Sequence, residues 1–470
     1  MLDTRVPPLR SDLENFPQHV FRAYDIRGVA GTELSTAVVH DIGLALGSEV
    51  ISQGGNSMVV ARDGRLSGPE LVAALKEGIL TTGCNVIDIG VVPTPVLYFA
   101  THVTGTNSGV MLTGSHNPKE YNGLKMVVNG QALTQEPIER LYWRIRIGDI
   151  HTGEATEQSL DILPQYYQRI VEDVTLSQPL KIVVDAGNGV GAVTAPVLLE
   201  KLGCEVIPLY CEVDGEFPNH HPDPGKPENL VDLIAAVKTH QADLGLAFDG
   251  DADRVGVVTP QGKIIWPDRQ LMAFAQAICQ HNPGAAIVFD VKCSRDVARV
   301  VEQAGGTPVM YRTGHSVIKT KMKQIQALFA GEMSGHLFFA DRWYGFDDGV
   351  YAAARLLEIL AGQSLDADEF FAQIPEAVST PEINIAVSDD EKFGLVERLV
   401  QCADFPGAKI IDTDGLRVEF ADGWALVRAS NTTPSLVLRF EADDEAALTR
   451  IQTEFKAYLL SQAADLSIPF

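Results

Sequence analysis

The chain has 470 residues, of which 46% are hydrophobic and 21% are charged, and its formal net charge is −25. This length exceeds what one hydrophobic core supports, so we expect three or four domains. The acidic balance argues against nucleic-acid and anionic-membrane partners, because both need basic patches. The sequence has no membrane-length apolar run, no N-terminal apolar signal segment and no CxxC pattern among its six cysteines. We therefore expect a cytoplasmic protein with reduced thiols.

The first regular pattern covers residues 57–90, SMVVARDGRLSGPELVAALKEGILTTGCNVIDIG. It predicts a strand, a glycine-containing loop, an amphipathic helix and a second strand, which is the order of a βαβ unit. The apolar stretch GVML follows and continues into TGSHNP. Gly114 with Asn117-Pro118 supplies a turn, but turn formation does not require Ser115 and His116. These two residues are either incidental polar residues of the turn or a presented nucleophile or covalent carrier beside a histidine.

The same order of elements occurs twice more, at residues 181–210 and 285–314. After each copy, a short apolar strand again ends in a polar loop: LGLAF precedes DGDADR, and ALFA precedes GEMSGH. Strands that are almost continuously apolar indicate sheets covered on both faces. Three similar domains thus each present one unusual loop at the end of a strand, which is where ligands bind in α/β sheets. This regularity favours a functional role for Ser115.

The residues from about Pro381 onward change in character. We expect a strand at INIAV, a helix from Asp389 to Cys402, three more strands and a closing helix from Asp443 to Ser461. The turn Thr413-Asp414-Gly415 predicts a hairpin. The predicted fold class is α/β, with three similar α/β domains that have mixed sheets and a C-terminal α+β domain. The predicted domains are residues 1–160, 161–262, 263–372 and 373–470.

The loop AFDGDADRVG places Asp249, Asp251 and Asp253 at alternate positions. Three carboxylates so close together repel one another unless a cation lies between them, and oxygen ligands suit Mg²⁺. An EF-hand is excluded, because Arg254 stands where that loop needs glycine and Pro260 stands where it needs glutamate. The alternative is a solvated acidic loop, which the preceding apolar strand disfavours.

A magnesium ion is usually bound by a few carboxylates together with a phosphate. A phosphoryl group on Ser115 would supply that phosphate, and the cation would neutralise part of its charge. Metal ions and cationic side chains are also the main devices for transferring phosphoryl groups. Ser115 and the aspartate loop together therefore predict a phosphoserine poised on a metal ion.

Two further loops carry groups that suit a sugar phosphate. GEMSGH offers Glu332, Ser334 and His336, a set that suits sugar hydroxyls, and a structural turn would need only its glycines. RASNTTP, residues 428–434, combines an arginine with hydroxyls and an amide, which suits a phosphate, although a polar hairpin tip is the alternative. The stretch FPNHHPDPGKPENL contains possible metal ligands, but its four prolines favour a rigid extended loop. Those possible ligands are His220, His221 and Asp223.

From FRAYDIRG at residues 21–28 to RASNTTP, the motifs and their order resemble the α-D-phosphohexomutases, most closely the bacterial phosphomannomutase/phosphoglucomutase branch. The resemblance implies four domains around a central cleft, with phosphoserine at Ser115. It implies that Mg²⁺ is held by that phosphate and by Asp249, Asp251 and Asp253. It also implies that sugar hydroxyls bind Glu332, Ser334 and His336, and that the non-reacting phosphate binds Arg428, Ser430, Asn431 and Thr432. Further matching positions in the active site are Tyr24, Arg27, Lys125, Arg254, Lys292 and His315.

The reaction implied by this resemblance moves the phosphoryl group from Ser115 to the free hydroxyl of a hexose 1- or 6-phosphate. The bisphosphate then turns end for end and returns its other phosphate to the serine, so glucose or mannose 1,6-bisphosphate is the expected intermediate and activator. Lys125 and Arg254 would stabilise the moving phosphoryl group, and Arg27 belongs to the same catalytic set. His116 and His315 are both candidates to accept the hydroxyl proton.

The methionine of GEMSGH resembles the mannose/glucose branch, whereas the glucosamine branch more often has glutamine there. Phosphoglucosamine mutase activity by the same mechanism remains an alternative. Ala252 departs from the glycine of some close relatives, and its methyl group should not affect metal binding. We expect a monomer that acts on hexose phosphates.

Two other classes of protein compete with a phosphohexomutase. DADRV, residues 251–255, fits the pattern of haloacid-dehalogenase-like phosphotransferases, in which Asp251 would be the nucleophile and Asp253 the acid/base. That interpretation leaves TGSHNP, GEMSGH and the repeat unexplained. A non-catalytic sugar-phosphate binder would need a lost carrier or metal ligand, and the sequence shows neither loss.

Overall fold

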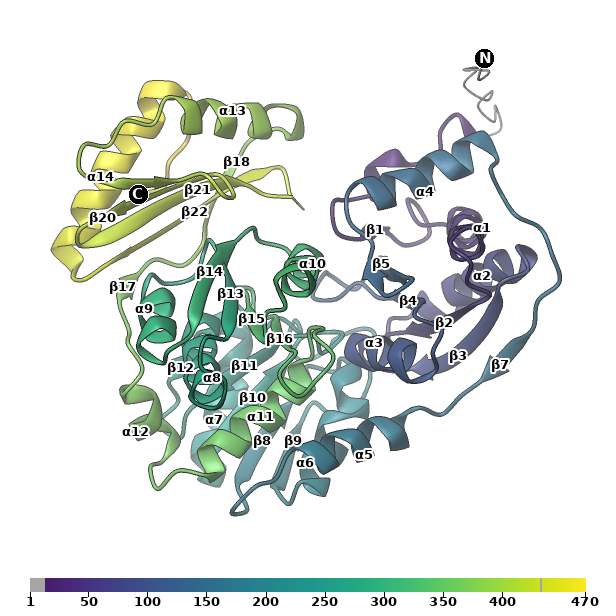
Figure 1. Cartoon of the computed structure of the whole chain (residues 1–470), viewed down its shortest axis with the longest axis horizontal. Helices are drawn as coiled ribbons and strands as arrows, with labels where there is room; N and C mark the ends of the chain where they lie inside the picture. Colours follow the sequence, from purple (N-terminus) through teal and green to yellow (C-terminus); the bar gives the residue numbers. More distant parts are fainter. Residues whose placement is uncertain (1–12, 432) are drawn as a thin grey trace. The chain divides into compact units, whose positions relative to one another are not determined.

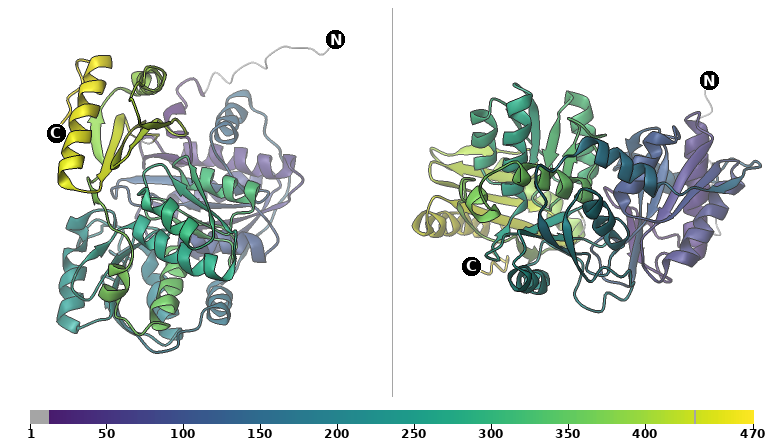
Figure 2. Two further views of the ribbon diagram at one scale, coloured as in Figure 1. Left: turned by 60° about the vertical axis from the view of Figure 1, so that its left-hand side comes forward. Right: turned by 90° about the horizontal axis from the view of Figure 1, so that it is seen from below.

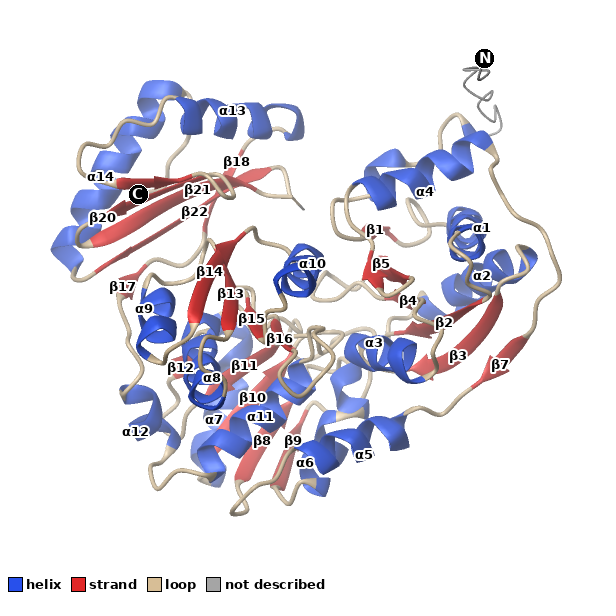
Figure 3. Ribbon diagram, viewed as in Figure 1, coloured by secondary structure: helices blue, strands red, loops and turns tan. Residues whose placement is uncertain are grey.

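The structure is a computed structural model that describes residues 13–431 and 433–470. The chain forms two compact units, and strands and helices alternate along much of its length (Figures 1 and 3). Unit one contains the described residues up to Ile265 together with Ser334–Phe370, and unit two contains Trp266–Met333 and Phe371–Phe470. None of the described helices combines the length and the apolar character needed to cross a membrane.

The first sheet of unit one is a mixed sheet of seven strands: β1 (Ile26–Val29), β2 (Ser57–Arg62), β3 (Asn85–Val91), β4 (Gly109–Leu112), β5 (Tyr121–Val128), β6 (Gln131–Ala132) and β7 (Glu157–Ser159). Their order is β1-β5-β4-β2-β3-β7, and β6 pairs with β5. Strands β4, β2, β3 and β7 are parallel, whereas β5 is antiparallel to both neighbours. The accompanying helices are η2 (Gln18–Val20), α1 (Thr36–Ser52), α2 (Gly68–Thr81), α3 (Thr94–Val103) and α4 (Glu136–Ile147).

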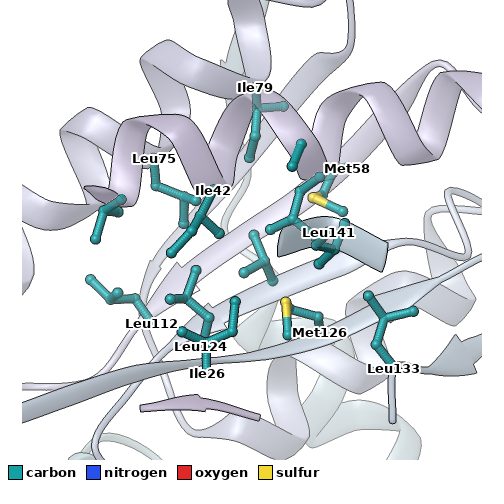
Figure 4. Close-up of a cluster of buried hydrophobic side chains, with 14 of the residues drawn as sticks. Ile26, Ile42, Met58, Leu75, Ile79, Leu112, Leu124, Met126, Leu133 and Leu141 are labelled. Atoms are coloured by element: carbon teal, nitrogen blue, oxygen red, sulfur yellow. The ribbon is translucent and has the colours of Figure 1, made fainter. Parts of the chain in front are cut away.

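The core of this first domain contains apolar side chains of the sheet and of helices α1, α2 and α4 (Figure 4). Ile42 of α1 and Leu124 of β5 are among its fully buried members. Helices α1 and α2 meet backbone to backbone, because a Cβ atom on Gly43 would lie 2.4 Å from the carbonyl oxygen of Leu75. A Cβ atom on Gly78 would lie 2.2 Å from a backbone oxygen of α1. The two glycines therefore set how closely the helices pack.

The second sheet of unit one contains β8 (Lys181–Asp185), β9 (Glu205–Leu209), β10 (Leu244–Phe248), β11 (Val255–Val258) and β12 (Ile264–Ile265), in the order β12-β11-β10-β8-β9. It is also mixed: β8, β9 and β10 are parallel to one another, whereas β11 is antiparallel to its two neighbours, β10 and β12. The remaining elements of unit one are α5 (Leu163–Asp173), η3 (Val190–Val193), α6 (Ala195–Lys201), η4 (Pro227–Leu230), α7 (Val231–His240), β16 (Leu337–Phe339) and α11 (Gly349–Ala361).

Unit two begins with a third α/β domain. Its strands β13 (Ala286–Asp290), β14 (Thr307–Tyr311) and β15 (Phe329–Gly331) are parallel, with β13 in the middle. Its helices are α8 (Pro267–His281), α9 (Asp296–Gln303) and α10 (His315–Ile325). Helix α12 (Ala367–Ala372) precedes the C-terminal domain.

The C-terminal domain has a six-stranded antiparallel sheet: β17 (Val378–Ser379), β18 (Ile383–Ala386), β19 (Lys409–Ile411), β20 (Leu416–Phe420), β21 (Gly423–Ala429) and β22 (Ser435–Ala442). Helices α13 (Asp389–Gln401) and α14 (Glu445–Gln462) pack against β21 and β22 (Figure 2). The hairpin of β19 and β20 turns where the sequence predicts it.

The repeat predicted from the sequence is confirmed by the strand pairing. In each α/β domain, the strand that ends in an unusual loop runs parallel to the first strand of the βαβ unit: β4 beside β2, β10 beside β8, and β15 beside β13. Parallel neighbours end at the same edge of a sheet, so all three loops leave at carboxyl strand ends. The structure thus has the predicted three α/β domains and an α+β domain.

Candidate active site

The serine loop, residues 113–118, follows β4 in unit one. Ser115 has a backbone φ of +49° and is only 1% exposed. Its backbone N–H donates to Thr113 Oγ1 at 2.8 Å. A Cβ atom on Gly114 would lie 2.3 Å from the guanidinium carbon of Arg65, so only glycine fits there. The loop therefore presents a buried serine in a left-handed conformation that residues other than glycine rarely adopt.

The aspartate loop, residues 249–254, follows β10 and meets the serine loop. The three aspartates are fully buried, and one oxygen of each lies within 4.8 Å of the others. The hydroxyl of Ser115 donates to Asp249 Oδ2 at 3.2 Å and lies 3.2 Å from His116 Nδ1. A Cβ atom on Gly250 would lie 2.2 Å from the carbonyl oxygen of Ser115, so the two backbones touch. The fold thus joins a serine and an aspartate that are 134 residues apart in the chain.

A buried lysine neutralises part of this cluster. Lys125 of β5 donates from Nζ to Asp251 Oδ2 at 2.7 Å and to Asp253 Oδ2 at 2.5 Å. Burial opposes the charged form of Asp251, but Lys125 and the hydroxyl of Thr94 outweigh it and lower the pKa of Asp251 to about 2. For Asp249, burial and the charges of the other two aspartates raise the pKa well above its usual value. The cluster therefore combines one carboxylate whose pKa is lowered with one whose pKa is raised.

Arg254 and His336 also lie beside the aspartates. Arg254 Nε donates to His336 Nε2 at 3.1 Å and lies 3.7 Å from Asp249 Oδ2. The second imidazole nitrogen, His336 Nδ1, lies 3.0 Å from Asp347 Oδ2 and 3.5 Å from Asp253 Oδ1. Because Nε2 accepts a hydrogen, the neutral ring carries its own proton on Nδ1, facing these carboxylates. The imidazole of GEMSGH is thus oriented by the aspartate loop.

The N-terminal residues of the predicted site lie beside the serine loop. Arg27 of β1 donates to Asn117 Oδ1 at 2.8 Å and to Asp25 Oδ2 at 2.5 Å. Tyr24 is half-buried near the start of the same strand. Burial lowers the pKa of His116 well below its usual value, and the charges of Arg254 and Arg27 add to the effect. His116 is therefore a neutral imidazole near pH 7.

Unit two contains Lys292 and Arg428, two cations of the predicted substrate-binding set, and each faces a carboxylate. Buried Lys292 donates from Nζ to Glu382 Oε1 at 2.6 Å. Burial opposes the charged form of Lys292, but Glu382 and Asp290 outweigh it and raise its pKa. Arg428, at the end of β21, donates from Nε to Asp414 Oδ2 at 2.9 Å. Both cations are therefore held in place by ion pairs within unit two.

The other predicted residues lie as follows. Glu332 is buried and accepts a hydrogen bond from the backbone N–H of Gly314 at 2.5 Å. His315 is half-buried at the start of α10, with Nδ1 3.3 Å from Ser316 Oγ. Ser430 Oγ accepts from the backbone N–H of Thr433 at 3.1 Å. Ser334 and Asn431 are half-buried, and Thr432 lies outside the described residues.

Comparison with models of known protein families shows to which family the chain belongs. The phosphoglucomutase/phosphomannomutase alpha/beta/alpha domains I, II and III match residues 18–149, 164–262 and 266–378, and the C-terminal domain of that family matches residues 382–457. The chain belongs to the phosphoglucomutase/phosphomannomutase family. It is therefore an isomerase of the phosphohexomutase type, and the family, fold class and enzyme class predicted from the sequence are confirmed.

Individual members of the family are similar to this chain over almost their full length. A phosphomannomutase/phosphoglucomutase from Pseudomonas aeruginosa is 57% identical over 454 residues, which cover 97% of this chain and 98% of that protein. A phosphoglucomutase from Neisseria meningitidis serogroup A is 50% identical over 455 residues, which cover 96% of this chain and 98% of that protein. A crystal structure of a phosphoglucomutase/phosphomannomutase family protein from Burkholderia thailandensis has a TM-score of 0.92 at 52% identity, and the match covers 96% of this chain and 99% of that one.

Phosphohexomutases are metal-dependent, and the aspartate loop is an acidic group that fits a metal ion. Asp251 Oδ1 is buried and receives no hydrogen bond from the residues that the structure describes. The three aspartates and Ser115 offer only oxygen ligands, which is the donor set that Mg²⁺ prefers. The residues present therefore fit a hard divalent cation.

Several residues that support the site were not found by sequence analysis. Arg65 and Asp63 bind the serine loop, and their signal is the charged stretch RDGR directly after the first apolar strand. His220 and His221 were considered in the sequence only as possible metal ligands. In the structure, His221 Nε2 lies in hydrogen-bonding contact with the carbonyl oxygen of His116, and His220 lies 3.0 Å from Asp185. The proline-rich loop thus packs on the serine loop. Among the described residues, its histidines do not belong to the aspartate cluster or to the second group that could hold a metal ion, which is Asp253, His336 and Asp347.

Proposed function

We propose that the protein interconverts the 1- and 6-phosphates of mannose and glucose through a phosphoserine at Ser115 and a hexose 1,6-bisphosphate intermediate. The observation that carries this proposal is the buried Ser115 hydroxyl, which donates to Asp249 at 3.2 Å beside three aspartates and Lys125. A serine alone is a weak nucleophile, and this set of charged groups is the kind that stabilises a transferring phosphoryl group. The names of the similar proteins from Pseudomonas aeruginosa and Neisseria meningitidis support these sugars.

The first half of the proposed reaction breaks the bond between phosphorus and Ser115 Oγ and forms a bond to the free sugar hydroxyl. The hydroxyl proton passes to a base, for which His315 and His116 are the candidates, and the leaving Ser115 Oγ takes up a proton to become a hydroxyl. Mg²⁺, held by Asp249, Asp251, Asp253 and the serine phosphate, would supply positive charge to the phosphoryl oxygens. Lys125 and Arg254 supply further positive charge beside them.

The second half returns the other phosphate of the bisphosphate to Ser115. The serine hydroxyl must then lose its proton, and His116 Nδ1 lies 3.2 Å from that oxygen. Asp249 Oδ2 lies at the same distance from that oxygen, and we assign the serine proton to His116 because Asp249 is also a proposed ligand of Mg²⁺. Because burial keeps His116 neutral, its Nδ1 is available as an acceptor in the tautomer that carries hydrogen on Nε2.

The remaining predicted residues are assigned to substrate binding. Glu332, Ser334 and His336 would bind sugar hydroxyls, and Arg428, Ser430, Asn431 and Thr432 would bind the non-reacting phosphate. Tyr24, Arg27, Lys292 and His315 would complete the binding set. We also propose that the enzyme is a cytoplasmic monomer.

Mass spectrometry tests the carrier directly. The protein is incubated with glucose 1,6-bisphosphate and Mg²⁺ and then treated with or without hydroxylamine, which removes acyl phosphates but leaves phosphoserine intact. We expect a resistant phosphoryl group on the peptide that contains Ser115, and none there in the Ser115→Ala variant. A hydroxylamine-sensitive group on the peptide that contains Asp251 would replace this mechanism with an aspartyl-phosphate one. Comparing turnover of mannose, glucose and glucosamine phosphates then identifies the sugar.

A further inference from the structure

Arg65 is a fully buried arginine whose guanidinium lies against the serine loop. Nη2 donates to the carbonyl oxygens of Ser115 and Asn117, both at 2.7 Å. Nη1 donates to the carbonyl oxygens of Pro118 at 2.6 Å and Tyr121 at 2.9 Å. One side chain therefore binds four backbone carbonyls in and just after the loop that carries the proposed phosphoserine.

Asp63 completes this arrangement from the other side of Ser115. Its Oδ2 accepts from Arg65 Nε at 3.1 Å, from Thr113 Oγ1 at 2.8 Å and from the Gly114 N–H at 3.2 Å. Thr113 Oγ1 in turn accepts from the backbone N–H of Ser115. The Asp63–Arg65 pair thus reaches the serine through its N–H on one side and its carbonyl oxygen on the other.

The hydrogen bonds of Arg65 exclude a direct role in binding phosphate. A guanidinium has five N–H donors, and here the one on Nε binds Asp63 while the four on the two terminal nitrogens bind the four carbonyls. The side chain is 1% exposed, and the ring of Phe217 lies 5.3 Å from its guanidinium carbon. All five donors are already used inside the protein, so Arg65 acts on the loop itself.

The conformation of Ser115 explains why such a clamp is needed. A left-handed backbone is strained for an L residue, and it persists only where the surroundings fix it. The carbonyl oxygen of Ser115 that binds Arg65 is also the atom against which Gly250 of the aspartate loop packs. A change at Arg65 would therefore move Ser115 relative to the three aspartates.

We propose that Arg65, together with Asp63, is a positioning residue for phosphoryl transfer, because the pair fixes the Ser115 backbone so that Oγ faces the aspartate loop. This inference rests on the proposed phosphoserine function. Any buried ion pair affects the stability of the fold. The inference assigns this pair an additional role, in the rate of phosphoryl transfer.

The test compares the full-length Arg65→Lys variant with the wild-type enzyme. Lysine keeps the charge but has three donors on one nitrogen, so it cannot bind both sides of the loop. We expect kcat to fall roughly 10- to 100-fold, as for a misplacement of about 1 Å. We expect KM for glucose 1-phosphate to stay within about twofold of wild type, because the change removes no substrate contact. The rate at which glucose 1,6-bisphosphate phosphorylates Ser115, followed by quenched-flow mass spectrometry, should fall in parallel with kcat.

A matched control separates positioning from stability. Arg355 is also buried in unit one, where it binds Asp341 at 2.8 Å, and it lies outside the predicted site. Arg355→Lys should lower the melting temperature and keep the wild-type kcat per folded molecule. If Arg65→Lys behaves in the same way, with a lower melting temperature but unchanged kcat and phosphorylation rate, the positioning role is overturned.

A second variant keeps the test decisive if Arg65→Lys does not fold. Thr113→Val retains the side-chain volume and leaves the Asp63–Arg65 ion pair intact, while it breaks the link between Asp63 and the Ser115 N–H. It should slow phosphorylation of Ser115 with little change in KM, and a wild-type rate would overturn the inference. If wild-type Ser115 itself takes up no phosphoryl group, the proposed function fails and this inference falls with it.

Discussion

Lys125 offers the sharpest test of how the aspartate loop is stabilised. Its ammonium group is buried and bonds to Asp251 at 2.7 Å and to Asp253 at 2.5 Å. Lys125→Met removes the charge and keeps a side chain of similar length. Two buried carboxylates then lose their closest counter-ion among the side chains of the site.

The structure sets the size of the expected effect. At an effective dielectric constant of 20, opposite charges 2.7 Å apart attract by about 6 kcal/mol, but the cost of desolvating them offsets much of this. Breaking a buried ion pair by removing one partner typically costs about 3–5 kcal/mol. We therefore expect Lys125→Met to lower the free energy of unfolding of the metal-free protein by about 3–5 kcal/mol.

The assay is urea unfolding at pH 7 in EDTA and again with Mg²⁺. Mg²⁺ at about 100 times its dissociation constant should stabilise the folded state by about 2.7 kcal/mol. The Lys125→Met variant should therefore recover part of its lost free energy of unfolding when Mg²⁺ is added. Lys119→Met is the control, because Lys119 makes a similarly short ion pair with Glu216 at the exposed surface and should contribute little. A Lys125→Met protein as stable as wild type in EDTA would refute the argument that the lysine compensates the cluster.

Two further predictions concern pH and metal. Burial raises the pKa of Asp348, which caps α11 by accepting from the Tyr351 N–H, to about 7. The stability that this raised pKa contributes is complete below about pH 4 and is lost as the pH rises through 7. Over that range the free energy of unfolding of the wild type should therefore fall by about 4 kcal/mol relative to that of Asp348→Asn. Urea titrations from pH 4 to 8 measure this, and parallel curves for the two proteins would contradict it. EDTA should abolish mutase activity and Mg²⁺ should restore it, with Asp251→Asn needing more Mg²⁺ for half-maximal activity; full activity in excess EDTA would exclude a required metal.

Much of the fold was predictable because its signals are local. The strands GVML and LGLAF are apolar runs with nothing polar inside them, and the polar residues directly after them stand out. The repeated order of strand, helix and strand then identifies equivalent positions, and the structure pairs those strands in the same way three times. Ser115 and the aspartates could be proposed as partners from their chemistry alone.

The roles of the supporting residues could not be predicted, because they depend on partners distant in sequence. Arg65 binds carbonyl oxygens some 50 residues away, and any backbone carbonyl has the same chemistry. The pairing of Lys292 with Glu382 joins residues 90 positions apart in two domains of unit two. A charged residue in a loop is usually a solvated one, so burial and pairing emerge only when the chain is folded.

The carboxylates that face Lys292 and Arg428 have a consequence for selectivity. If Arg428 binds the non-reacting phosphate as proposed, and Lys292 of the same binding set also turns to the substrate, the incoming anionic group would replace Asp414 and Glu382 as their partners. Binding is then an exchange of one anion for another. A neutral hexose has no charge to offer in that exchange, so the exchange would by itself distinguish phosphorylated from free sugar, without any contact to a sugar hydroxyl.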